Sequence, residues 1–148
     1  MIGLKWTNHD YFTMHRIKEL KGGNINVTGG SSVLTLSGNH AANGGVFYVD
    51  NGNITANAIS KSTISNNYST AEGGAFYVNN GNILLSVTEL SGNGKSGSEV
   101  KTTNGGAIAL KNGVFSFADG SEIRGNAATG NGGAIFWEGS NGTENNCN

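Results

Sequence analysis

The stretch Gly73-Gly74-Ala75-Phe76-Tyr77-Val78 follows a pattern that occurs four times in this chain. In each copy a double glycine precedes a small or branched residue and then aromatic or aliphatic residues; the other copies are at 44–49, 105–110 and 132–137. The copies are nearly evenly spaced along the chain. A period of roughly 30 residues indicates a structural unit that is stacked on copies of itself.

Two further signals recur in every unit. An Asn-Gly pair, which tolerates positive φ and marks tight turns, follows the double-glycine segment, as in Asn80-Gly81. Short runs of β-forming residues come next, and each unit then carries an aliphatic residue three places before an asparagine, at Asn39, Asn67, Asn93 and Asn126. Three short strands per unit without helical periodicity predict an all-β solenoid of about four to five rungs, a rung being one turn of the coil.

Alternation along a strand assigns the two faces of each double-glycine segment. One set is consistently large and apolar and is predicted to lie in the core: Phe47/Val49, Phe76/Val78, Ile108/Leu110 and Ile135/Trp137. The other set faces outward: Val46/Tyr48, Ala75/Tyr77, Ala107/Ala109 and Ala134/Phe136. The four recurrent asparagines are predicted to form a structural ladder at a corner, where their amides bond from rung to rung.

The chain divides into three parts. Residues 1–20 contain glycine only at Gly3 and are predicted to cap the open end of the solenoid, as a short helix or a strand. Residues 21–142 hold the repeats, and the connector at 94–104 is the longest, so it is expected to project as a loop. Residues 143–148 are expected to be a tail at a truncation point.

Composition narrows the function classes. Glycine (25 residues) and asparagine (22) make up nearly a third of the 148 residues, and proline is absent. A formal net charge of −1 argues against nucleic-acid binding through a basic surface. The sequence has no uninterrupted apolar stretch long enough to predict a membrane-spanning helix, and residues 1–20 lack the apolar core of a secretory signal. If the protein is exported, its signal and anchor are therefore expected not to be in this chain.

The repeat resembles a known family. A GGA motif followed by a branched or aromatic residue, alternating with FxxN, is typical of the polymorphic outer membrane proteins of chlamydial-type autotransporters. This chain offers GGVF at Gly44, GGAF at Gly73 and GGAI at Gly105 and Gly132, preceded by LSGN, ISNN, LSGN and IRGN. Leu or Ile thus replaces the Phe of FxxN in every unit. The resemblance covers roughly residues 22–142 and implies a right-handed parallel β-helix passenger, displayed at the surface and adhesive.

Catalysis and metal binding have weak support. Glu89 and Glu122 each precede the aliphatic anchor of their unit, and adjacent rungs would place them about 4.8 Å apart, a spacing that a retaining glycosidase could use. No arginine or lysine recurs beside this pair, and Thr35 and Thr63 occupy the equivalent earlier positions. The histidines at 9, 15 and 40 and the single Cys147 form no ligand motif. No catalytic residue, metal or cofactor is predicted.

The outward row offers the more informative surface. Tyr48, Tyr77 and Phe136 are possible ligand contacts, because aromatic platforms bind sugar faces and protein patches. Packing beneath the N-terminal segment is the competing explanation for the same residues. The predicted function is a non-enzymatic extracellular or outer-membrane-associated adhesin or structural stalk that contacts a host or cell-surface protein or glycan. The alternatives are a carbohydrate-binding or a polysaccharide-processing β-helix protein.

Overall fold

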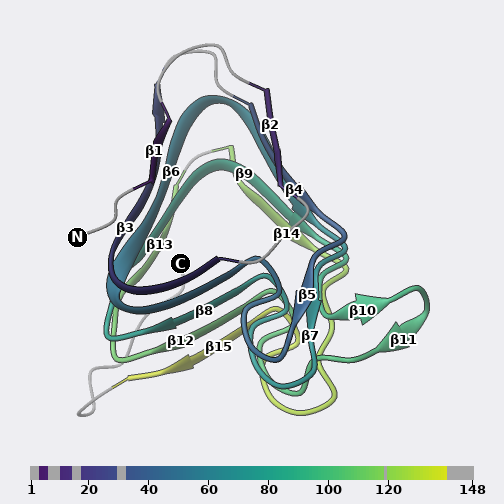
Figure 1. Ribbon diagram of the computed structural model, residues 1–148. Helices are drawn as coiled ribbons and strands as arrows, with labels where there is room; N and C mark the ends of the chain where they lie inside the picture. Colours follow the sequence, from purple (N-terminus) through teal and green to yellow (C-terminus); the bar gives the residue numbers. More distant parts are fainter. Residues whose placement is uncertain (1–3, 7–10, 15–17, 30–32, 119, 140–148) are drawn as a thin grey trace.

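A computed structural model describes residues 4–6, 11–14, 18–29, 33–118 and 120–139. All regular structure within these residues is β-strand, and the chain coils as a parallel β-solenoid of about four turns. This confirms the predicted fold class. Figure 1 looks along the coil and shows a roughly triangular cross-section with three walls.

The strands follow one another around the coil and then repeat. Their bounds are β1 (Leu4–Trp6), β2 (Tyr11–Met14), β3 (Lys18–Gly29), β4 (Val33–Ser37), β5 (His40–Ala41), β6 (Phe47–Ser65), β7 (Tyr68–Ser69), β8 (Phe76–Asn79), β9 (Ile83–Ser91), β10 (Lys95–Ser96), β11 (Glu99–Val100), β12 (Ile108–Lys111), β13 (Phe115–Phe117), β14 (Glu122–Arg124) and β15 (Ile135–Glu138). Among these described strands, every pair is parallel except the antiparallel hairpin β10–β11.

Each wall is one ladder of strands. The double-glycine wall contains the first part of β3, the first part of β6, and then β8, β12 and β15. A second wall contains β1, the later part of β3, the middle of β6, the start of β9, and β13. The third wall contains β2, β4, the end of β6, the end of β9, and β14. The long strands β3 and β9 therefore run through a corner from one wall to the next, and β6 runs through all three walls (Figure 1).

The core lies inside the coil, where apolar side chains from the three walls meet. Phe47 stacks on Phe76 with ring centroids 5.6 Å apart, and Ile108 follows in the same row. The predicted core residues of the first three double-glycine segments are all buried, and Ile135 and Trp137 pack against them partly buried. The aliphatic anchors of the third wall form a second interior row, of which Leu36, Ile64 and Leu90 are fully buried. Stacking in register buries apolar area on every rung, which is the main favourable term in folding.

One part of the face assignment is wrong. Val46, Ala75 and Ala107 were predicted to face outward, but none of them is exposed. The strands begin one residue later, and the amides of Val46 and Phe47 both donate to the carbonyl of Ala75, so strict alternation does not extend to this position. Ala109 does alternate outward and stands outside the core cluster, yet it is also fully buried. The larger side chains of Tyr77 and Phe136, its neighbours in register, shield it from solvent.

Left-handed backbone forms the corners. The first glycine of each double glycine has positive φ, for example +67° at Gly73, and so does the asparagine of each Asn-Gly turn within the described residues, for example 53° at Asn80. A third position, just before the ladder asparagine, is also left-handed in every unit: Gly38, Asn66, Gly92 and Gly125. Glycine and asparagine are the residues that adopt this region most readily, so their recurrence follows from the triangular path.

The first turn begins earlier than the glycine pattern indicates. β3 starts at Lys18, and residues 18–21 pair with Phe47–Asp50 without a preceding double glycine. Within the predicted cap, β1 and β2 add parallel strands beyond β3 and β4, while residues 1–3, 7–10 and 15–17 lie outside the described part. The predicted tail at 143–148 lies outside it as well. The long connector forms the hairpin β10–β11, which projects from the coil (Figure 1).

Candidate binding surfaces

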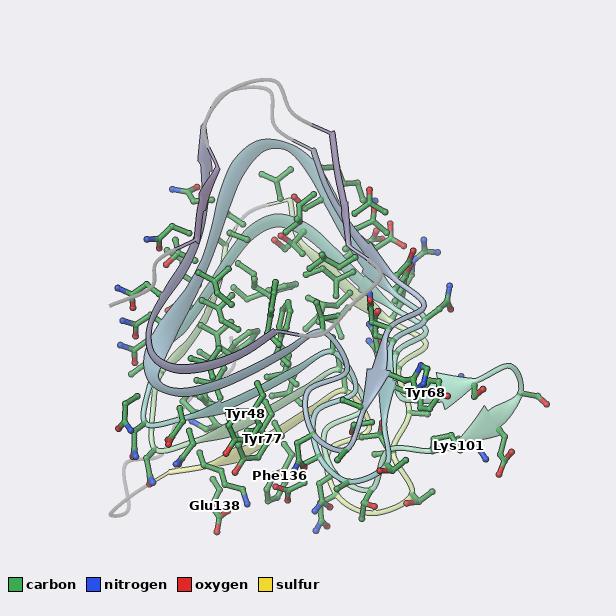
Figure 2. All side chains as sticks on the ribbon, viewed as in Figure 1. Tyr48, Tyr68, Tyr77, Lys101, Phe136 and Glu138 are labelled. Carbon is green, nitrogen blue, oxygen red and sulfur yellow. The ribbon has the colours of Figure 1, made fainter. Side chains whose placement is uncertain are left out.

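The predicted aromatic row lies on the outer face of the double-glycine wall. Tyr48 and Tyr77 occupy equivalent positions in neighbouring rungs, and their rings stack with centroids 4.9 Å apart and planes 9° from parallel. Phe136 continues the row beyond Ala109, and all three aromatic side chains are partly exposed. Figure 2 shows Tyr48, Tyr77 and Phe136 following one another along this wall. The rung spacing of about 4.8 Å enforces this stack, because a parallel ladder repeats side chains at that interval.

Charged side chains border the row. The ammonium group of Lys111 lies 5.8 Å from the centre of the Tyr77 ring, within cation–π range, and 2.9 Å from a carboxylate oxygen of Glu72. Burial on its own would raise the pKa of Glu72, but hydrogen bonds from Lys111 and Asn104 outweigh it and lower that pKa. Burial raises the pKa of the Tyr77 phenol. At neutral pH the surface thus combines neutral aromatic rings with a fixed ion pair.

The four recurrent asparagines lie in one column at the corner after the third wall. In three successive steps, the side-chain oxygen of one asparagine accepts both the backbone N–H and the side-chain amide of the asparagine one rung earlier, at 2.9–3.1 Å. The Nδ2 of Asn67 also donates to the carbonyl of Leu36, at 3.0 Å. Asn39, Asn67 and Asn93 are almost completely buried. We call this column the asparagine ladder; it is scaffold, with its polar atoms directed at the chain itself.

A second column was missed in the sequence. The side-chain oxygen of Asn24 accepts the N–H of Asn53, that of Asn53 accepts the N–H of Asn82, and that of Asn82 accepts the N–H of Val114. These bonds measure 2.9–3.0 Å and lie at the exposed Asn-Gly corner. The signal was present, because an asparagine follows the glycine of this turn in three units.

Glu89 and Glu122 are neighbours in register, as their spacing predicts. The expectation that no basic side chain accompanies them is wrong. Lys61 donates to both carboxylates, with N–O distances of 2.8 Å to Glu89 and 3.3 Å to Glu122, and the Arg124 guanidinium also bonds to Glu89. Lys61 lies in the rung before Glu89. Arg124 lies in the rung after Glu89, two residues beyond Glu122 on the same strand. These side chains therefore meet only because the rungs stack.

The ion pairs decide what this cluster can do chemically. Hydrogen bonds from Lys61, Arg124 and Ser91 lower the pKa of Glu89 to about 2. A general acid in glycoside hydrolysis needs a raised pKa, so that it carries a proton near neutral pH. Glu89 has the opposite shift, so its carboxylate is ionised at neutral pH. The arrangement therefore favours a structural ion-pair cluster over a catalytic pair.

This shift predicts a specific acid sensitivity. Because the folded-state pKa of Glu89 lies below its unfolded value, its stabilising contribution is complete above pH of about 4.5 and is lost as pH falls toward 2. Glu89→Gln should lower the melting temperature at pH 7, and the gap to wild type should close between pH 5 and pH 2. Thermal unfolding followed by circular dichroism measures both. Glu99→Gln, at an exposed hairpin carboxylate, is the control and should show a much smaller gap at pH 7.

A groove lies between the coil and the projecting hairpin. It encloses about 630 Å³ and is lined by Gly38, His40, Asn66, Tyr68, Gly92, Lys95, Ser96 and Gly97. The His40 and Tyr68 rings, paired in register on β5 and β7, stack with centroids 5.1 Å apart and planes 7° from parallel. In the sequence His40 belongs to no ligand motif, and the long connector that forms the far side of the groove has no periodicity, so the groove could not be predicted. His9, His15 and Cys147 lie outside the described residues.

One segment of the coil, which includes the end of the third wall and the corner after it, is similar to a known repeat family. Residues 61–79 match the Chlamydia polymorphic membrane protein repeat. The matched segment contains the Ile64-Ser65-Asn66-Asn67 motif, the β7 connector and the GGAF motif at Gly73, which together make up one complete corner. No curated protein and no solved structure matches the chain.

The repeat and the solenoid together fit a surface-associated, autotransporter-like passenger, since the matched family is associated with the outer membrane. Within the described residues, no three histidine, cysteine or carboxylate side chains gather as a potential metal site. The same part of the chain contains no helix long and apolar enough to cross a bilayer. Among the described residues, the aromatic row and the groove both place partly exposed aromatic rings near a lysine side chain.

Proposed function

We propose that this chain is a non-enzymatic segment of an extracellular passenger, in which stacked rungs form a stalk and the aromatic row makes an adhesive contact. The partner is a host or cell-surface protein or glycan. The observation that carries the proposal is the in-register stack of Tyr48 on Tyr77 on the outside of a flat parallel wall. Partly exposed aromatic side chains offer large contact area at little cost in conformational entropy.

The surroundings of the row support the same function. Lys111, held by Glu72, and the exposed Glu138 place opposite charges beside the rings. Aromatic centres with a charged rim are typical of protein recognition surfaces. The solenoid holds these groups on a rigid wall, so little ordering is needed on binding. The polymorphic membrane protein repeat at residues 61–79 supports display at a cell surface.

Binding of the fluorescently labelled chain to cultured host cells tests the proposal. The double variant Tyr48→Ala/Tyr77→Ala should reduce bound protein at least about tenfold, because two central aromatic contacts are lost. Val114→Ala is the matched control, since Val114 is an exposed hydrophobic residue (54% exposed) next to the second wall. Circular dichroism should show that both variants keep the fold.

Equal binding by wild type and the double variant would exclude the aromatic row as the contact. No cell binding by the wild type would leave the stalk function alone. Protease treatment of the cells distinguishes the two partner classes, because a protein receptor is destroyed and a lipid-linked glycan is retained.

Carbohydrate binding remains the second candidate, because aromatic rings on a sheet face also stack on sugar rings. It predicts that the same double variant loses signal on a glycan array. Polysaccharide cleavage receives less support, since the pKa of Glu89 is lowered and its carboxylate is held by two cations. Glu89→Ala should leave any polysaccharide cleavage by the chain unchanged.

A further inference from the structure

The groove beside the hairpin has one wall made of aromatic rings. His40 covers one face of the Tyr68 ring, so the opposite face points toward the next rung, which contains Asn93. Gly94 occupies the equivalent position there, because its N–H donates to the carbonyl of Asn67 as the N–H of Tyr68 donates to that of Asn39. Because glycine has no side chain, nothing at position 94 stacks on this face of Tyr68. Figure 2 shows Tyr68 at the base of the hairpin.

Packing keeps that position empty. A Cβ atom on Gly94 would lie 1.9 Å from the carbonyl oxygen of Ala127 in the next rung, and the φ of Gly94 is +88°. No side chain fits there without displacing backbone. The chain instead leaves the coil after Gly94, and Lys95, Ser96 and Gly97 form the far side of the groove. The open ring face and the hairpin therefore belong to one concave site.

Among the described residues, the groove is lined by one lysine, Lys95, and by no carboxylate. Lys95 makes no ion pair within the described residues, whereas Lys101 on the returning side of the hairpin is paired with Glu99 at 2.7 Å. The side chain of Asn66 is exposed, and Ser96 adds a hydroxyl group. In the part of the chain that the structure describes, no aspartate or glutamate lines the groove. A ligand thus meets one ammonium group, neutral hydrogen-bonding groups and a flat aromatic face.

We propose that this groove binds an acidic sugar, a pyranose ring that carries a carboxylate. The apolar face of the sugar ring packs on Tyr68, the carboxylate pairs with Lys95, and Asn66 and Ser96 hydrogen-bond to ring hydroxyls. The volume of about 630 Å³ is in the range of small-ligand sites. The site is separate from the aromatic row, and it adds a defined ligand class to the proposed adhesive function.

Titration of the purified ¹⁵N-labelled chain tests this directly by NMR. The probes are N-acetylneuraminic acid and glucuronic acid, with galactose as the neutral comparison. Both acids should shift the amide signals of residues 66–68 and 95–97 with millimolar affinity, the range expected for a single sugar ring, and galactose should bind at least about tenfold more weakly. Lys95→Gln should weaken binding of both acids at least about tenfold, because it removes a charge-assisted bond.

Three further variants test whether the charge of Lys95 and the ring of Tyr68 make the contact. Lys101→Gln removes a hairpin lysine that is already paired and should leave affinity unchanged. Tyr68→Ala should abolish binding, while Tyr68→Phe, which keeps the ring, should bind within about threefold of wild type. Equal binding of galactose, equal losses in Lys95→Gln and Lys101→Gln, or no shifts at residues 66–68 and 95–97 would each overturn the proposal. Because no cells are used, these outcomes are independent of whether Tyr48 and Tyr77 mediate adhesion.

Discussion

Replacing Gly74 by alanine is expected to destabilise the chain by roughly 3 kcal/mol or more, and to lower its melting temperature by about 10 °C. A Cβ atom at this position would lie 1.9 Å from the carbonyl oxygen of Gly106 and 2.7 Å from the backbone nitrogen of Gly94. Both neighbours are backbone atoms of the next rung, held by hydrogen bonds such as that from the Gly74 N–H to the carbonyl of Gly105. Neither can move without opening the stack. Thermal and urea unfolding measure the loss.

The chain supplies its own control for this experiment. Gly133 holds the same place in the last double glycine, but a Cβ atom there meets no atom within 4 Å. Gly133→Ala should therefore change stability by less than about 0.5 kcal/mol. If the two variants unfold at the same temperature, contact between rungs is not the reason for the second glycine, and backbone propensity would have to explain both.

Replacing Asn67 by alanine should cost about 3–5 kcal/mol, because several buried polar groups lose their partners at about 1–3 kcal/mol each. The side-chain oxygen of Asn67 accepts two donors from Asn39, at 3.0 Å each, and its Nδ2 donates to the carbonyl of Leu36 and to Asn93. Asn67 is fully buried, so water cannot replace these bonds. Urea unfolding should show a lower midpoint with an unchanged slope.

Asn82→Ala is the matched comparison, because it removes the same kind of rung-to-rung bond at the exposed corner. The side-chain oxygen of Asn82 accepts the N–H of Val114 at 2.9 Å, in contact with solvent. Water can satisfy that donor, and we expect a loss of less than about 1 kcal/mol. Equal losses in Asn67→Ala and Asn82→Ala would contradict burial as the source of the larger effect.

Most of the fold could be predicted from the repeat period. Phe47, Phe76 and Ile108 were placed in one buried row because a stack of identical units must align equivalent residues. The column of Asn39, Asn67, Asn93 and Asn126 followed from the same alignment. The errors lie at the start of the double-glycine strands and ahead of the first double glycine. Val46 is buried because the strand begins one residue later than the motif, and β3 begins at Lys18 although no double glycine precedes it.

Of the candidate surfaces, only the one built from the repeated motif could be predicted from the sequence. Tyr48 and Tyr77 could be placed in one outward row, since both are in the repeated motif. Lys61 could not be placed beside Glu89, because no motif links residue 61 to residue 89 and their contact depends on how side chains lean across rungs. The groove at Tyr68 depends on a hairpin that interrupts a single connector of the described coil, so no comparison among units could reveal it.

The parallel coil, its corners and its core could be predicted from the repeats, because each unit has the same turn residues and the same apolar spacing, and local rules act on every copy alike. The pairing of charges and the position of the groove became visible only in the folded chain. Those features arise between rungs, from side chains far apart in the sequence such as Lys61 and Glu89, and from the hairpin that leaves the coil at Gly94. Contacts of that kind depend on distances in space that the spacing along the chain does not contain.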